Sequence, residues 1–216
     1  MLAGTRRGPH DGARHECSEM TNVERARIDS GSLGDASRYR TLAALEEGLR
    51  ALATPKDGGR VALIVVRGEG GRRAELARVR LEVDAGLPGD AWGRQPEPHL
   101  EKALAVMQSD VAELIANGQP LALFGDNLFL SLDLSTANLP PRSRLRIGGA
   151  LLEVTPMPHN GCHKFQARFG ADALRFVVKS ELRHRNLRGV YLRTVEGGEV
   201  AVGDPVAVIR RVRSLR

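Results

Sequence analysis

The pattern of apolar and polar positions predicts a domain of many short β-strands and few helices. Residues 60–66 form a continuous apolar, β-branched run, which is typical of a buried strand. Apolar and charged residues alternate over 75–83, which predicts a second strand joined to the first through the glycine-rich turn at 68–71. Further strands are expected at 128–132, 144–147 and 151–155, and residues 190–195, the turn at 196–199 and residues 200–209 are expected to form a last antiparallel region.

Helical periodicity occurs at three places. Leucines at 42, 45, 49 and 52 share one stripe, which predicts a short amphipathic helix ending before Pro55. Ser109 is expected to cap a helix that runs from residue 110 to about 117, and Asp172 to cap one with Leu174, Val177, Val178 and Leu182 inward. Short strands, glycine turns and few helices together predict a mainly β (α+β) fold, a closed or nearly closed β-barrel rich in antiparallel pairs.

Composition divides the chain into four parts. Residues 1–40 hold few large apolar residues and are expected to be a disordered tail, followed by a helix and linker at 41–57. The barrel is expected over 58–210, with a basic tail at 211–216. No apolar run reaches the length of a membrane span, and the start of the chain lacks a secretory h-region. Two cysteines form no disulfide framework, so we expect a cytoplasmic protein that does not interact with membranes.

Positive charge is concentrated in one internal segment. The net charge is +6, and residues 160–193 contain eight Lys or Arg and two acidic residues. Such a segment suits an anionic ligand, although a solvated helix face would have the same composition. With one Trp and two Tyr, stacking platforms for nucleic acid are scarce, so we expect no nucleic-acid partner.

The most informative residue is Cys162. It follows a loop broken by Pro156 and Pro158, and His159, His163 and Lys164 surround it. Nearby cations favour the thiolate, which can attack, carry sulfur or ligate a soft metal. The alternative is a small, buried, inert thiol. If Cys162 opens a short helix, Lys164 and Arg168 lie one turn apart, and the helix N-terminus attracts anions.

Several familiar motifs are absent from the sequence. There is no CxxC pair and no His-x-x-x-His, so a structural zinc site is not expected. Glycines 68, 70 and 71 have the wrong spacing for a phosphate-binding loop. The chain also lacks a flavin, haem or iron–sulfur motif, so redox chemistry would need a separate electron donor.

Four segments together resemble the MOSC domain, named after the C-terminal domain of molybdenum cofactor sulfurase. They are Gly86-Leu87-Pro88-Gly89-Asp90; Phe124-Gly125-Asp126-Asn127-Leu128, where the family typically has G-E-N-L; residues 145–155 leading to Cys162; and Arg188-Gly189-Val190-Tyr191 with residues 196–204. The resemblance extends over about residues 60–209. Asp126 departs from the family's Glu, and His159-Asn160-Gly161 is not the commonest sequence before the cysteine.

The resemblance implies a compact barrel and a cytoplasmic protein connected with molybdenum cofactor (molybdopterin). It places the sulfur or metal chemistry at Cys162, which would ligate molybdenum or carry sulfur. His159 and His163 are candidate catalytic residues beside it. Candidate cofactor-binding residues are Gly125, Asp126, Asn127, Asn160, Lys164, Arg168 and Arg188. Asn127 could instead satisfy a turn, and Gly89 and Asp90 could simply close one.

Two functions of different classes follow. The first is a MOSC-domain protein that binds molybdenum cofactor, or transfers sulfur or metal, through a reactive cysteine. It could be a small molybdoenzyme that reduces N-hydroxylated compounds with an electron-transfer protein as partner, or a carrier supplied by a cysteine desulfurase. The alternative is a non-catalytic barrel that binds an anionic ligand or acidic partner through its basic surface. No sequence feature specifies the oligomeric state.

Overall fold

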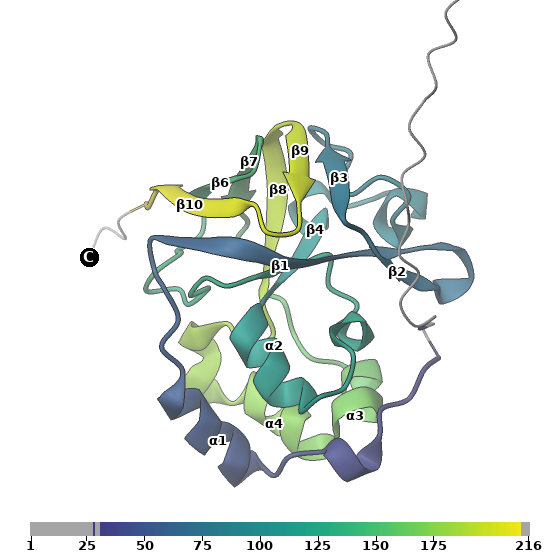
Figure 1. Ribbon diagram of the computed structural model, residues 1–216, viewed down its shortest axis with the longest axis vertical. Coiled ribbons are helices and arrows are strands. Elements are labelled where there is room, and N and C mark those ends of the chain that lie inside the picture. Colours follow the sequence, from purple (N-terminus) through teal and green to yellow (C-terminus); the bar gives the residue numbers. More distant parts are fainter. Residues whose placement is uncertain (1–27, 29–30, 213–216) are drawn as a thin grey trace, which may run out of the picture.

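A closed β-barrel forms one half of the molecule (Figure 1). The computed structural model describes residue 28 and residues 31–212. Its strands are β1 (Gly58–Arg67), β2 (Arg73–Glu75), β3 (Arg78–Leu81), β4 (Leu104–Gln108), β5 (Leu128–Leu130), β6 (Arg144–Ile147), β7 (Ala150–Val154), β8 (Val190–Glu196), β9 (Gly198–Ala201) and β10 (Pro205–Arg210).

The pairing closes the sheet on itself. Among the described residues, seven strands follow one another in the order β1-β10-β6-β7-β8-β4-β5, and β5 pairs again with β1. The pair β4–β5 is parallel, and the other pairs around the barrel are antiparallel. β2 extends from β1 as a hairpin, and β3 pairs separately with β9. The predicted mainly β, closed, antiparallel-rich barrel is therefore confirmed.

The α-helices lie together on one side of the barrel, below it in Figure 1. They are α1 (Leu42–Ala51), α2 (Ser109–Ala116), α3 (His163–Phe169) and α4 (Ala171–Val178). Short 3-10 helices connect the elements: η1 (Ala36–Arg38), η2 (Glu69–Gly71), η3 (Ala91–Arg94), η4 (Leu100–Lys102), η5 (Leu121–Phe124) and η6 (Ser180–Arg185). The structure confirms the predicted helix at 42–52, and α3 begins directly after Cys162 as expected.

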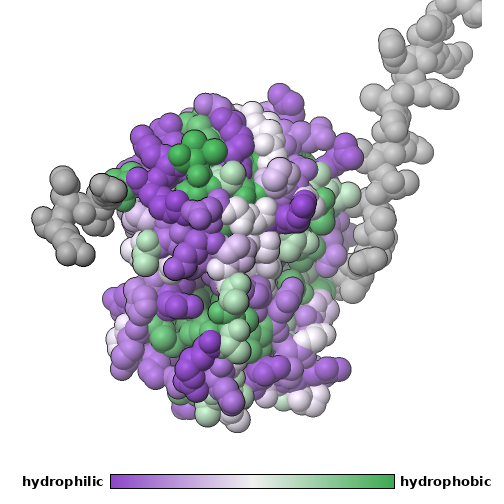
Figure 2. Space-filling model, turned by 60° about the vertical axis from the view of Figure 1, so that its left-hand side comes forward, coloured by the Kyte–Doolittle hydropathy of each residue, from purple (hydrophilic) through white to green (hydrophobic). Residues whose placement is uncertain are grey.

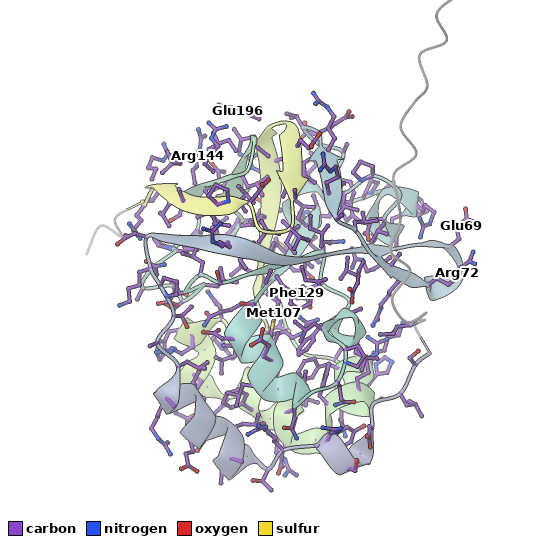
Figure 3. The ribbon with its side chains drawn as sticks, viewed as in Figure 1. Glu69, Arg72, Met107, Phe129, Arg144 and Glu196 are labelled. Carbon is purple, nitrogen blue, oxygen red and sulfur yellow. The ribbon has the colours of Figure 1, made fainter. Side chains whose placement is uncertain are left out.

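Strands between the barrel and the helices are buried on both faces. In β4, Val106 points into the barrel core, whereas Met107 packs in a second core against the helices. In β5 the same division separates Leu128 from Phe129, and Figure 3 shows Met107 and Phe129 at the junction of the two layers. Burial on both faces explains why these strands read as continuous apolar runs rather than as alternating ones.

Several sequence predictions are wrong in detail. The strand expected over 75–83 is divided into β2 and β3, and only β2 pairs with β1. The strands of the last predicted antiparallel region do not pair with one another. Instead, β9 pairs with β3, and β10 pairs with β1 and β6. Ser109 and Asp172, predicted to cap α2 and α4, are not the N-cap residues of these helices. Gln108 and Gly170 hold the N-cap positions. Val178 is 48% exposed rather than inward.

The last part of the stretch expected to be disordered packs on the domain. Residues 1–27 and 29–30 lie outside the described residues, but residues 31–40 contact α2 and α3. The Gly34 amide donates to the Ala167 carbonyl, and the Tyr39 hydroxyl donates to the same oxygen at 2.9 Å. The Asp35 amide donates to Gln119. Hydrogen bonds between backbone groups, and between backbone and side chains, hold this segment, so hydrophobic periodicity gave no sign of it.

The surface is largely hydrophilic. On the face shown in Figure 2, apolar residues gather in one patch at the level of the helices and another near the top of the barrel, each bordered by hydrophilic residues. In the C-terminal tail, Arg211 donates to the Asp57 carboxylate at 2.7 Å, whereas residues 213–216 lie outside the described residues. Among the described residues, no helix has the length and apolar character needed to cross a bilayer.

Gly189, at the start of β8, offers a direct test of the packing. Its φ is +96°, and a Cβ atom there would lie 2.1 Å from the Val106 carbonyl oxygen of β4. We expect Gly189→Ala to destabilise the protein by on the order of 3 kcal/mol, because both the φ angle and the contact become unfavourable. Gly93→Ala is the matched control, since nothing lies within 4 Å of its added Cβ. Equal melting temperatures for the two variants would contradict this packing.

Candidate functional site

A cavity of about 460 Å³ opens between the β1–β2 hairpin, η3, the loop after η5 and the start of α3. Its volume lies in the range typical of small-molecule sites, roughly 300–1,000 Å³. Basic residues dominate its lining: Arg67, Arg73, Arg94, Lys164, Arg168 and Arg188. Among the described residues, Glu69 is the single acidic residue that lines it, and Figure 3 places Glu69 at the tip of the β1–β2 hairpin. The cavity therefore suits an anionic ligand.

Cys162 lines this cavity and is exposed. It is the N-cap residue of α3, and its carbonyl accepts from the Gln166 amide at 3.0 Å. The preceding Gly161 packs directly on α4, where an added Cβ would lie 2.6 Å from a methyl group of Leu174. The loop is thus seated against a helix while its thiol stays accessible. The alternative expectation that this thiol is buried is wrong.

Two arginines meet beside the thiol on one carbonyl group. Arg73 is 8% exposed, and its Nη1 donates to the carbonyls of Ala122 and Leu123 at 2.7 and 2.6 Å. Arg168 is 5% exposed and donates to the same Leu123 carbonyl at 3.0 Å. Burial and the nearby Arg168 lower the pKa of Arg73 to about 10. The two guanidinium groups therefore lie close enough to affect each other electrostatically.

Below the cavity lies a buried ion pair. Nη1 of Arg188 donates to Oδ2 of Asp126 at 2.6 Å, and Asp126 is fully buried. The other carboxylate oxygen, Oδ1, is 3.5 Å from Nδ1 of His159, and neither atom has a hydrogen-bond partner. The His159 ring packs on Tyr191 with centroids 4.4 Å apart. Burial and Asp126 raise the pKa of Tyr191.

A second buried carboxylate, that of Asp90, fixes the orientation of Arg67, which lines the cavity. Asp90 accepts from Nε of Arg67 at 3.0 Å and from the Trp92 amide, so it both anchors the arginine and caps η3. Desolvation opposes ionisation of Asp90, but the hydrogen bonds from Arg67 and Trp92 hold its pKa below the usual value. Asn127 joins this network, because its side-chain amide donates to Asp90 at 3.0 Å and its side-chain carbonyl accepts from the Ala105 amide.

The structure brings together most of the residues expected from the sequence. Those that line the cavity are Cys162, His159, Gly125, Lys164, Arg168 and Arg188. Asp126 supports Arg188 from below, whereas Asn127 is fully buried and bonded to β1 and β4, which corresponds to the structural alternative. His163 and Asn160 are exposed and do not line this cavity.

Sequence reasoning missed Arg67, Arg73, Arg94 and Tyr191. Arg67 and Arg73 stand on either side of the glycine-rich turn at 68–71, which by its spacing looked like simple turn chemistry. The hairpin folds back so that both arginines line the cavity. Their only sequence signal is an arginine on each side of a tight turn, and that pattern is common on surfaces.

Comparison with solved structures supports the fold. The chain is similar to a hypothetical protein of known crystal structure, at 19% identity over 72% of this chain and 70% of the other, with a TM-score of 0.50. It is also similar to the YUAD protein from Bacillus subtilis, at 14% identity over 69% of this chain and 94% of the other, with a TM-score of 0.51. The comparison with curated proteins finds no match.

A closed mixed barrel with a cysteine at the mouth of a basic cavity defines the class of protein. The model of the MOSC domain family matches residues 98–207. The chain therefore belongs to the MOSC domain family. The match includes the Asp126 loop, Cys162 and Arg188, whereas the first resembling segment, Gly86 to Asp90, precedes it.

The burial of His159 predicts a pH-dependent stability. Burial, Arg188 and Arg67 lower its pKa from 6.5 to about 3, and Asp126 offsets this only in part, because Arg188 neutralises that carboxylate. Between pH 7 and pH 5 the unfolded chain therefore takes up a proton that the native state excludes. The free energy of unfolding should fall by about 2 kcal/mol from this residue as the pH drops.

Urea unfolding of the wild type and of His159→Gln at the two pH values measures this effect. The variant should lose less stability than the wild type on acidification, by about the same 2 kcal/mol. An equal loss in both proteins would mean that His159 is protonated in the native state at pH 5.

Proposed function

We propose that this MOSC-domain protein binds molybdenum cofactor in the arginine-lined cavity, with the thiol of Cys162 available to the metal or to a transferred sulfur. The observation that carries the proposal is the pair of buried arginines, Arg73 and Arg168, beside the exposed thiol. A phosphate-bearing pterin would bring negative charge to a cavity whose described lining is mainly basic among its charged residues.

The residues of the cavity fit such a group in charge and size. Of the residues that the structure describes, six basic ones and one acidic one line the cavity of about 460 Å³. The Nε atom of Arg188 is buried without a partner, so an acceptor on the ligand would satisfy it. Gly125, with φ +77°, lets the loop pass close to Arg73, because an added Cβ would be 3.0 Å from the guanidinium.

Each group has a distinct task in this proposal. Arg73 and Arg168, with Lys164 at the entrance, would hold the phosphate through charge-assisted hydrogen bonds. Asp126 keeps Arg188 in place, and the neutral imidazole of His159 can accept a hydrogen bond at the nitrogen that does not face Asp126. When bound, the cofactor supplies redox chemistry at a metal for which a thiolate is a suitable soft ligand.

The thiol distinguishes the two functions weighed from the sequence. A barrel that only binds an acidic partner needs no accessible cysteine at its most basic cavity. The exposed position of Cys162 therefore favours cofactor or sulfur chemistry over the pure binding module. A cysteine desulfurase or an electron-transfer protein remains the class of partner that this function would require.

Metal and pterin content of the purified protein tests the proposal. From a host that makes the cofactor, we expect the wild type to retain molybdenum and pterin in equal amounts. Cys162→Ser should lose molybdenum or the transferable sulfur while its melting temperature stays unchanged, since the side chains are of similar size. Lys164→Ala should weaken pterin retention roughly 10-fold, the effect of about 1.4 kcal/mol.

Arg175→Ala is the matched control for loss of positive charge. Its side chain is 71% exposed on α4 and lies outside the cavity, so pterin content should not change. Wild-type protein without molybdenum or pterin would overturn the proposal. Full molybdenum content and full sulfur transfer in Cys162→Ser would show that the cysteine is dispensable.

A further inference from the structure

A second cavity lies behind the first and shares a wall with it. It measures about 430 Å³ and lies between the loop before Cys162, the end of α4 and η6. The two cavities have only His159 and Arg188 in common, so these two side chains separate them. Nothing in the family match or the proposed function requires this second space.

The lining of the second cavity is apolar on one side and basic on the other. Pro158, Val177, Val178 and Leu187 supply the apolar side, and Val178 is 48% exposed although it is a large hydrophobic residue. Arg183 and Arg188 supply positive charge, and no carboxylate from the part of the chain that the structure describes lines this cavity. Such a lining suits a ligand with a flat apolar body and one negative group.

The shared wall is buried and held by an ion pair. The His159 side chain is 8% exposed, and its Nδ1 lies 3.5 Å from Oδ1 of Asp126. Arg188 donates to the other oxygen of that carboxylate at 2.6 Å. These contacts fix the two side chains that separate the cavities.

The loop geometry connects this cavity to the cysteine. Gly161 packs on α4 so closely that an added Cβ would lie 3.1 Å from Val177, a residue that lines the second cavity. The same short loop supplies Pro158, His159 and Asn160 to the second cavity and Cys162 to the first. A molecule in the second cavity would therefore lie against the segment that positions the thiol.

We propose that the second cavity is a binding site for a small organic carboxylate with an apolar body, distinct from the anion site of the first cavity. Its apolar part packs against the valines of α4, and its carboxylate faces Arg183. The proposal does not depend on molybdenum cofactor, because it rests on a different lining.

Benzoate is the probe, with benzamide as the uncharged molecule of the same shape. In NMR titrations of the full-length protein, benzoate should shift amide signals at 158–161 and 177–188 in a saturable way and leave 67–73 unchanged. Benzamide should bind at least about fivefold more weakly, since it lacks the charge. Benzoate shifts confined to 67–73, or equal binding of benzamide, would overturn the proposal.

Two variants locate the site. Arg183→Ala should weaken benzoate binding about five- to tenfold, and Val178→Trp should block the entrance, because position 178 is already exposed and tolerates bulk. Arg175→Ala removes a cation from α4 outside both cavities and should change nothing. If Arg175→Ala weakens benzoate as much as Arg183→Ala, the binding is a general charge effect and no site exists.

Discussion

The ion pair between Arg188 and Asp126 is the interaction on which the arrangement of this molecule depends. Both side chains are buried, and 62 residues of chain separate them. Removing either partner would leave an uncompensated charge where water cannot reach it, which typically costs about 3–5 kcal/mol. Because Asp126 follows η5 and Arg188 precedes β8, the pair joins the helical side of the molecule to the barrel wall.

The position of the site follows from the two cores. The barrel interior is filled by apolar side chains. The second core, between barrel and helices, includes Phe124, Phe165 and Phe169, and the ring of Phe124 stacks on Phe169 at 4.1 Å. Arg188 lies over the ring of Phe165 at 5.3 Å, at the edge of this core. Polar groups gather where aromatic packing ends, and the cavities open there.

Positive charge has two different roles around this edge. Arg67 and Arg188 have carboxylate partners, Asp90 and Asp126, which hold them in fixed orientations. Arg73 and Arg168 instead both donate to one backbone carbonyl, that of Leu123. Ion pairs hold the first two arginines, and hydrogen bonds to the backbone orient the second two. The formal charge of the chain alone does not distinguish these roles.

Asp126 illustrates how one substitution in a motif changes its surroundings. The family typically has Glu at this position, one methylene longer. Here the shorter side chain reaches Arg188 with one oxygen and leaves the other 3.5 Å from His159, with no hydrogen bond. His159 is also unusual before the cysteine. Asp126 and His159, the two departures from the family sequence, therefore lie next to each other in the structure.

Much of this protein could be predicted from local sequence. Apolar runs and glycine turns predicted the strands, the leucine stripe predicted α1, and the motif around Cys162 identified the thiol, because these signals arise within a few neighbouring residues. The pairing partners of β3 and β9, the contacts of residues 31–40 and the convergence of Arg73 with Arg168 depend on segments far apart in the chain. Arg73 has no local feature that separates it from a surface arginine. Only the folding of the β1–β2 hairpin against η5, and the carbonyl of Leu123 that both arginines share, made it part of the site.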